Sequence, residues 1–305
     1  MFAQDYREQI MGNAFKTTFL LTLLTLVLVF VGGHFAGRNG LILGFGVAVA
    51  MNFFTYFYSD KLALKMYRAQ PVTREQLPRV YQVVEQMTQR LGLPMPKIYV
   101  IPNPSPNAFA TGRNPKHASV AVTEGILQLL KDEELAGVLA HELGHVQNRD
   151  ILTSSIAATL AGAITLIARM GYWAALFGGV GGRDSNERGG GGLGGLFMLI
   201  LAPIAATLIQ LAVSRSREYE ADATGAKTTG NPYALASALE KLEAYSKRLP
   251  MSASPTNAHL FIIAPLLGRG SFGNLFSTHP PTAKRIERLI GRSSVSGATP
   301  VRGAE

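Results

Sequence analysis

Apolar residues in this chain gather into four long blocks that polar stretches separate. The blocks cover about residues 17–34, 41–58, 151–168 and 196–213. Each is long enough for a helix, which rises ~1.5 Å per residue, to cross a hydrocarbon core of ~30 Å. The pattern therefore predicts four transmembrane helices, of which the first two form a hairpin. A cleaved signal peptide is the alternative for the first block, but it would have a shorter apolar core and no second block so close behind it.

The stretch between the second and third blocks has the mixed pattern of a soluble α+β domain. Residues 73–91 carry apolar positions at helical spacing. Three short segments with strand-like composition follow at 97–101, 107–111 and 118–122, and Thr123 can cap a further helix. This order predicts a small sheet. Its edge could hold a substrate in extended form, or the sheet could only brace the next helix, and the spacing favours neither interpretation.

The helix that follows contains the motif H-E-L-G-H, and Asp132 is expected to cap its start. His141 and His145 lie one turn apart on it, so their two imidazoles can bind one metal ion, for which Zn²⁺ is the expectation. Glu142 projects beside them, where its carboxylate can take a proton from a water that the metal activates. An ordinary helix with two exposed histidines is the alternative. The apolar stripe of this helix, however, points away from both rings, so they are not part of its core face.

A third protein ligand has to come from another part of the chain. If both later apolar blocks cross the bilayer, the segment after residue 213 returns to the side of the motif. On a helix there, Glu218 and Asp222 lie one turn apart. Glu218 can reach the metal, and Asp222 can accept a hydrogen bond from a liganding histidine. Glu220 is the nearest competitor, and a solvated face in which arginines pair with these carboxylates is the alternative.

Composition agrees with a membrane protein. Hydrophobic residues make up 47% of the chain and charged residues only 16%, with a mean hydropathy of +0.17. The absence of cysteine excludes disulfides, Cys-ligated zinc and a cysteine nucleophile. The chain has a net charge of +9 but no basic cluster interleaved with aromatic residues. This distribution predicts that the charge lies near a lipid bilayer rather than on a nucleic-acid-binding surface.

Basic residues flank the apolar blocks mainly on one side. By the positive-inside rule, both termini and the soluble domain are therefore expected in the cytoplasm. The residues on that side are Arg7, Lys16, Lys61, Lys65, Arg68, Arg149, Arg215 and Arg217, whereas Arg38, Arg183 and Arg188 lie on the other.

Three motifs together resemble those of the HtpX-type membrane zinc peptidases, which are relatives of the CAAX prenyl proteases. They are H-E-L-G-H at 141–145, S-R-S-R-E-Y-E-A-D at 214–222 and S-T-H-P-P-T-A-K-R-I-E-R-L at 277–289. The resemblance extends over nearly the whole chain. It implies an endopeptidase with one Zn²⁺ per chain that degrades damaged or misfolded membrane proteins at the cytoplasmic face of the bacterial inner membrane.

The resemblance also implies a role for particular residues. The metal ligands would be His141, His145 and Glu218, with Glu142 as general base and Asp222 behind a ligand. Asn107 and Ala108 would belong to a substrate-binding edge. His279, as an oxyanion stabiliser, and Arg285 would lie near the active site. From the residues alone, His279 could equally end a loop, and Arg285 could be a helix-surface cation or could neutralise a buried carboxylate such as Asp222.

The expected fold is a mainly α membrane protein with four transmembrane helices and a zincin-like α+β catalytic domain that contains a small sheet. The expected division is a hairpin at 1–58, catalytic halves at 59–150 and 214–290, two further spans with a glycine-rich loop (178–195) at 151–213, and a disordered tail at 291–305. A catalytically silent membrane scaffold with a structural metal is the alternative function, and it requires Glu142 to be dispensable. An intramembrane-cleaving peptidase is disfavoured by the polar residues on both sides of the motif.

Overall fold

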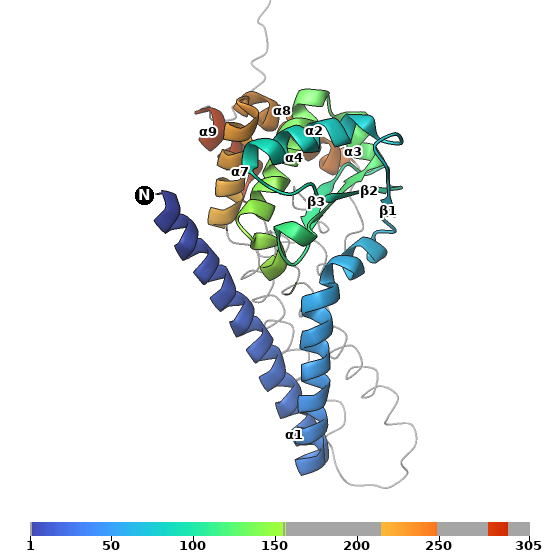
Figure 1. Cartoon of the computed structure of the whole chain (residues 1–305), viewed down its shortest axis with the longest axis vertical. Helices are drawn as coiled ribbons and strands as arrows, with labels where there is room; N and C mark the ends of the chain where they lie inside the picture. Colours follow the sequence, from blue (N-terminus) through green and yellow to red (C-terminus); the bar gives the residue numbers. More distant parts are fainter. Residues whose placement is uncertain (1, 155, 157–214, 249–279, 292–305) are drawn as a thin grey trace, which may run out of the picture.

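The computed structural model describes residues 2–154, 156, 215–248 and 280–291. In these ranges a long bent helix carries a domain in which a small sheet and several helices surround one central helix (Figure 1). The predicted third and fourth spans, the glycine-rich loop and the C-terminal tail lie wholly or mostly outside the described residues. The prediction of a mainly helical chain with a small sheet is confirmed.

Helix α1, Phe2–Met66, consists of two helices joined at a kink. At the kink Gly37 has φ of 55°, a left-handed conformation that glycine adopts without a Cβ penalty, and the chain reverses there. The two arms form the V in Figure 1. Phe15–His34 and Ala36–Tyr58 are both long and apolar enough to cross a membrane, and they contain the first two predicted blocks.

The arms touch because small residues face each other near the kink. A Cβ added to Gly40 would lie 1.8 Å from the carbonyl oxygen of Gly32, so no larger residue fits at this crossing. Farther along, the Asn52 side chain donates hydrogen bonds to Thr25 Oγ1 at 3.0 Å and to the carbonyl oxygen of Leu21 at 3.3 Å. These hydrogen bonds hold the two arms together beside the buried side chains of Leu20 and Leu24.

The sheet has four strands in the order β1-β2-β4-β3. They are β1 (Gln70–Pro71), β2 (Lys97–Ile101), β3 (Ala108–Thr111) and β4 (Ser119–Thr123). Strands β2 and β4 are parallel, and β3 pairs antiparallel with β4. The three predicted strands are confirmed to within one residue. Strand β1 was not predicted because two residues are too few to show an alternating pattern. Strand β3 lies at the edge of the described sheet.

Two predicted helix starts were wrong, for local reasons. Helix α2 spans Pro78–Leu91, and residues 73–77 precede it because Pro78 takes the first helical position, where its missing N–H costs nothing. Helix α4, Asp132–Gln147, is capped at Lys131 rather than at Asp132. The Glu134 carboxylate accepts a hydrogen bond from the backbone N–H of Lys131 at 2.9 Å. The predicted cap of α3 (Glu124–Leu129) is confirmed, since the side chain of its N-cap residue accepts from the Ile126 N–H at 3.2 Å.

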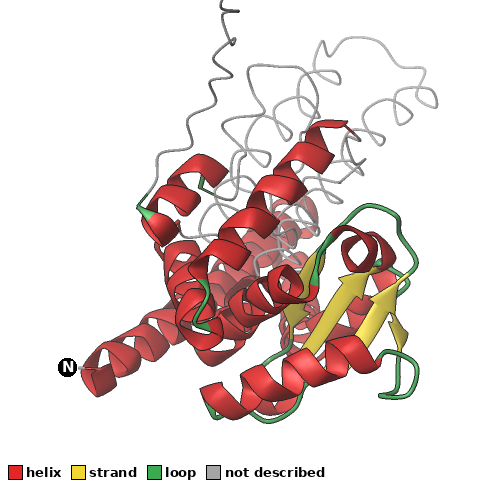
Figure 2. Cartoon of the chain, turned by 90° about the horizontal axis from the view of Figure 1, so that it is seen from above, coloured by secondary structure: helices red, strands yellow, loops and turns green. Residues whose placement is uncertain are grey.

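Helix α4 runs through the centre of the domain, with the sheet on one side and three helices from later in the chain on the other (Figures 1 and 2). Those helices are α7 (Arg215–Thr229), α8 (Pro232–Arg248) and α9 (Thr282–Ile290). The apolar core joins α2, β2, β4, α4 and α8. The sequence predicted a helix with one apolar stripe, but α4 is buried on nearly all sides because α7 covers its histidine face.

Candidate metal centre

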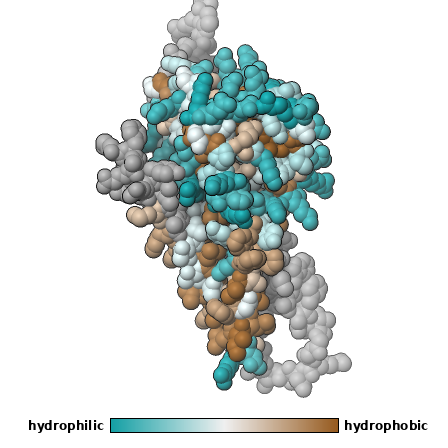
Figure 3. Space-filling view, in the orientation of Figure 1, coloured by the Kyte–Doolittle hydropathy of each residue, from teal (hydrophilic) through white to brown (hydrophobic). Residues whose placement is uncertain are grey.

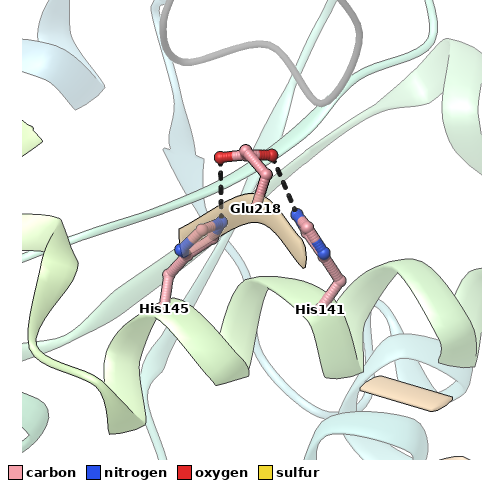
Figure 4. Close-up of side chains that lie close together, drawn as sticks. All are labelled: His141, His145 and Glu218. Atoms are coloured by element: carbon pink, nitrogen blue, oxygen red, sulfur yellow. Dashed lines mark ion pairs between the residues drawn. The ribbon is translucent and has the colours of Figure 1, made fainter. Parts of the chain in front are cut away.

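Two imidazoles on α4 and one carboxylate on α7 converge in the interior of the domain. The Nε2 atom of His141 lies 3.7 Å from Glu218 Oε2, and the Nε2 atom of His145 lies 3.5 Å from Glu218 Oε1 (Figure 4). One possible ligand atom from each residue lies within 4.8 Å of the others. The helical spacing of the two histidines therefore does place their rings side by side, and the carboxylate expected from the later segment meets them.

Close packing of α7 on α4 makes this convergence possible. A Cβ added to Gly225 would lie 3.0 Å from the backbone nitrogen of His141, so glycine allows the two helices to approach closely here. Ala221 is fully buried on the same face of α7. Glu218 and Asp222, one turn apart, both point toward α4, whereas Glu220 is exposed. The choice of Glu218 over Glu220 agrees with this geometry.

Distances and charges at this cluster fit a divalent ion. Donor atoms ~2.0–2.1 Å from a tetrahedral Zn²⁺ stand roughly 3.3 Å apart. The separations of 3.5 and 3.7 Å are near that value and too long for a hydrogen bond. Among the described residues around the rings, four buried carboxylates face two buried guanidinium groups, which leaves two negative charges in excess when both imidazoles are neutral. The groups are Glu142, Asp150, Glu218 and Asp222 against Arg217 and Arg285.

Each imidazole has a carboxylate behind it. Asp222 Oδ1 lies 2.9 Å from Nδ1 of His141, and Asp150 Oδ2 lies 3.3 Å from Nδ1 of His145. Burial by itself would lower the pKa of His145, but Asp150 and Glu218 raise it to about 9. Both rings therefore turn Nε2 toward Glu218 and Nδ1 toward a carboxylate, an orientation that suits a metal-binding histidine. The Nε2 atom of His141 also lies 3.5 Å from Nη2 of Arg285.

Asp150 and Arg217 were missed by the sequence reasoning. Arg217 Nη1 lies 3.9 Å from Asp150 Oδ1, and both side chains are buried. Asp150 ends a polar stretch, which we interpreted from the sequence as the boundary of a membrane span. The available signal was its position five residues after His145, just past the end of the same helix.

Arg285 on α9 is 1% exposed and forms a bidentate pair with Asp222. Its Nε donates to Asp222 Oδ2 at 2.8 Å and its Nη2 to Oδ1 at 2.7 Å. Burial opposes both charges, yet this pair holds the pKa of Asp222 down to about 2 and raises the pKa of Arg285 above its ordinary value. Of the two interpretations of Arg285, neutralisation of Asp222 is the one that this geometry matches. A guanidinium nitrogen also lies 3.9 Å from Glu218 Oε2.

Glu142 connects the cluster to the sheet. Its Oε2 accepts a hydrogen bond of 3.0 Å from the backbone N–H of Ala110 in β3. Burial raises the pKa of Glu142 above the ordinary glutamate value, although the neighbouring histidines act in the opposite direction. The carboxylate is therefore fixed beside the imidazoles, in surroundings that favour its uptake of a proton.

The backbone groups of β3 point alternately toward β4 and toward the opposite side, which is an edge of the sheet among the described residues. The Thr123 N–H donates to the Asn107 carbonyl at 2.9 Å, and the Asn107 N–H donates to Thr123 Oγ1 at 2.8 Å, so Asn107 faces β4. By the antiparallel alternation, the backbone groups of Ala108 and Ala110 point to the other side, which holds Glu142. The side chains of Asn107 and Ala108 are both buried. His279 lies outside the described residues.

Comparison with known proteins agrees with these observations. A model of peptidase family M48 matches residues 74–293. A protein named protease HtpX homolog from Desulfatibacillum aliphaticivorans is 56% identical over 95% of this chain and 93% of its own length. A protein of the same name from Thermococcus sibiricus is 50% identical over 92% of this chain and 96% of its own length. In fold, the chain resembles the crystal structure of S. mikatae Ste24p, with a TM-score of 0.53 and 18% identity over 93% of this chain and 67% of that one. The predicted resemblance is thereby confirmed, and the chain belongs to peptidase family M48.

Proposed function

We propose that this chain is a membrane-anchored zinc endopeptidase that cleaves damaged or misfolded membrane proteins at the cytoplasmic face of the membrane. Membership of peptidase family M48 makes it a membrane metalloprotease. The proposed zinc ion and the proposed cleavage mechanism rest on the arrangement of side chains at the site. The observation that carries them is the convergence of Glu218 on the Nε2 atoms of His141 and His145, beside a buried Glu142.

His141, His145 and Glu218 would hold one Zn²⁺ through two nitrogens and a carboxylate oxygen, a donor set that suits this ion. When bound, zinc supplies Lewis acidity, which lowers the pKa of a coordinated water and polarises the substrate carbonyl. Asp222 and Asp150 orient the two imidazoles, and Arg285 keeps Asp222 ionised.

Glu142 acts as the general base. It accepts a proton from the attacking water and then delivers that proton to the leaving amine. Its raised pKa suits both steps because a carboxylate in water would hold the proton too weakly. The hydrogen bond from the Ala110 N–H keeps the Glu142 carboxylate in place while the substrate is converted to products.

The edge of β3 that faces away from β4 would hold the substrate as an added strand. Backbone groups of Ala108 and Ala110 point to that edge, next to Glu142. Backbone hydrogen bonding is independent of the substrate's side chains, so this edge suits cleavage of unfolded chains of many sequences. Asn107, whose backbone is tied to β4, would fix the start of the edge strand.

The test compares wild type with Glu142→Gln, each purified as the full chain in detergent. We expect wild type to cleave an unfolded test protein. Glu142→Gln should bind as much zinc as wild type. It should lose more than 99% of the activity, because a general base contributes roughly 10²–10⁴-fold to the rate. Glu133→Gln is the matched control because Glu133 is exposed on the same helix. No cleavage above background by either protein, at equal zinc content, would instead indicate a silent scaffold, and equal cleavage by both would contradict Glu142 as the general base.

Substrate class and orientation need separate tests. In proteoliposomes, a membrane protein with a destabilised cytoplasmic loop should be cleaved faster than its stable parent. A periplasmically active reporter fused after Glu305 should stay inactive in cells if the C-terminus is cytoplasmic. Equal cleavage of both substrates contradicts the quality-control role, and strong reporter activity contradicts the orientation.

A further inference from the structure

A cavity of about 450 Å³ lies where the second arm of α1 meets the sheet. Three segments line it: the end of the arm from Phe53 to Leu64, the start of β2, and residues 113–119, which connect β3 to the first residue of β4. Its volume lies in the range of small-molecule sites. None of its lining residues belongs to the metal centre, so it is a separate site.

Positive charge dominates the cavity wall. Lys61, Lys97, Arg113 and Lys116 line it, together with a single carboxylate from Asp60. Across the described ranges of the chain, none of these four cations forms an ion pair with a carboxylate. The cavity therefore offers uncompensated positive charge to a ligand, and the ligand is expected to be an anion.

Aromatic rings position two of the cations without neutralising them. Lys61 Nζ lies 5.0 Å from the centre of the Tyr58 ring, and the Arg113 guanidinium lies 5.4 Å from that of Phe57. The Arg113 side chain also lies 2.8 Å from Nε2 of His117. A ring attracts a cation through its quadrupole and removes none of its charge, so both groups can still bind an anion.

One wall of the cavity is apolar and continues into the membrane span. Phe53 is 52% exposed and Phe57 is 40% exposed, and both belong to the candidate span Ala36–Tyr58. Figure 3 shows the hydrophobic arms below a hydrophilic domain, so this junction lies at the level where lipid headgroups begin. The ligand therefore needs an anionic head with an apolar tail beneath it, which neither free phosphate nor an acidic peptide has.

From these observations we infer that the cavity binds the headgroup of an anionic phospholipid. The phosphate lies among Lys61, Lys97 and Lys116, and the acyl chains follow the phenylalanines of the span. Asp60 accepts a hydrogen bond from a headgroup hydroxyl, as in phosphatidylglycerol.

Ser119, in the cavity wall, pairs with Thr111 at the end of β3. The bound lipid would thus hold the strand pair that carries Ala110 at a fixed height above the bilayer. This inference concerns how the domain sits on the membrane, and it stands whether or not the proposed proteolysis is correct.

The test measures phosphatidylglycerol binding to the full chain in detergent, with phosphatidylcholine as the neutral comparison. Every protein carries Glu142→Gln so that self-cleavage plays no part. The cavity variant is Lys97→Gln/Lys116→Gln. The matched control is Lys131→Gln/Lys284→Gln, which removes two exposed lysines outside the cavity and leaves the same net charge. Equal unfolding temperatures in phosphatidylcholine show that both variants fold.

We expect the cavity variant to lose roughly twentyfold in affinity for phosphatidylglycerol, because each cation near a lipid surface contributes about fivefold. The control should keep the affinity, and binding of phosphatidylcholine should be weak throughout. Equal affinities in the cavity variant and the control would overturn the inference. Displacement of the lipid by inorganic phosphate, or by an acidic peptide at similar concentration, would overturn it as well, because the tail would then contribute nothing.

Discussion

Asp150 Oδ2 lies 3.3 Å from Nδ1 of His145, on the opposite side of the ring from Glu218. Asp222 stands in the same relation to His141. Both rings are thus held from behind by a carboxylate while their Nε2 atoms meet at the centre. Only the contact of Asp222 follows from a recognisable motif, since Asp150 lies in the short segment between α4 and the third apolar block.

Asp150→Asn should weaken zinc binding by about 10- to 100-fold, because the uncharged amide orients the imidazole less firmly and makes it a poorer donor. Competition with a chromophoric chelator measures this affinity. Asp60→Asn, at the distant cavity, is the control and should bind zinc like wild type. An unchanged affinity in Asp150→Asn would contradict a role for Asp150 in zinc binding through His145.

Removal of the metal should abolish proteolysis and lower the unfolding temperature. The buried carboxylates around the rings then repel one another without a balancing ion. Zinc present at 100 to 1,000 times its dissociation constant stabilises the folded state by about 3–4 kcal/mol. Differential scanning calorimetry before and after chelation, and after return of zinc, checks this. Glu218→Gln should show little response to the chelator, and a full response would argue against Glu218 as a ligand.

Arg285→Met should destabilise the fold by about 3–5 kcal/mol, because it leaves Asp222 charged and buried without its partner. The double variant Arg285→Met/Asp222→Asn should recover part of that loss, since no unpaired charge remains. Lys284→Met, an exposed neighbour on α9, should change the stability by less than about 1 kcal/mol. Chemical unfolding in detergent measures these three variants and Asp222→Asn, which completes the comparison. Strict additivity of the two substitutions would contradict direct coupling.

Glu134 should make the free energy of unfolding depend on pH in the acid range. Burial raises its pKa, but Lys241 at 2.7 Å, the Lys131 N–H and Ser237 outweigh burial, so the pKa lies below the ordinary glutamate value. The folded chain therefore binds this proton less readily than the unfolded chain. The stabilisation is complete above the ordinary glutamate pKa and is lost as pH falls through the lowered one.

We accordingly expect Glu134→Gln to cost about 1–3 kcal/mol at neutral pH and much less in acid, measured as the free energy of unfolding at several pH values. Glu133→Gln, exposed on the same turn, should show no such pH-dependent difference. If Glu134→Gln lowers the free energy of unfolding by the same amount at every pH, the effect depends on the shape of the side chain rather than on its charge.

The local features were predictable from the sequence because they depend on neighbours in the chain. Helical spacing placed His141 and His145 on one face, and the strand-like segments became β2, β3 and β4. The apolar blocks at the start of the chain became the two arms of α1. Errors at this level were boundaries, such as the start of α2, where one proline decided the position.

Other features depended on which elements pack together, and only the tertiary structure decided them. Burial of Glu142 follows from α7 covering α4 and from the backbone of β3 reaching its carboxylate. The roles of Asp150 and Arg285 follow from the docking of segments far apart in sequence. Periodicity along one helix reports which of its faces is apolar, but the partner of a buried charge is set by another element, and that information lies in the packing.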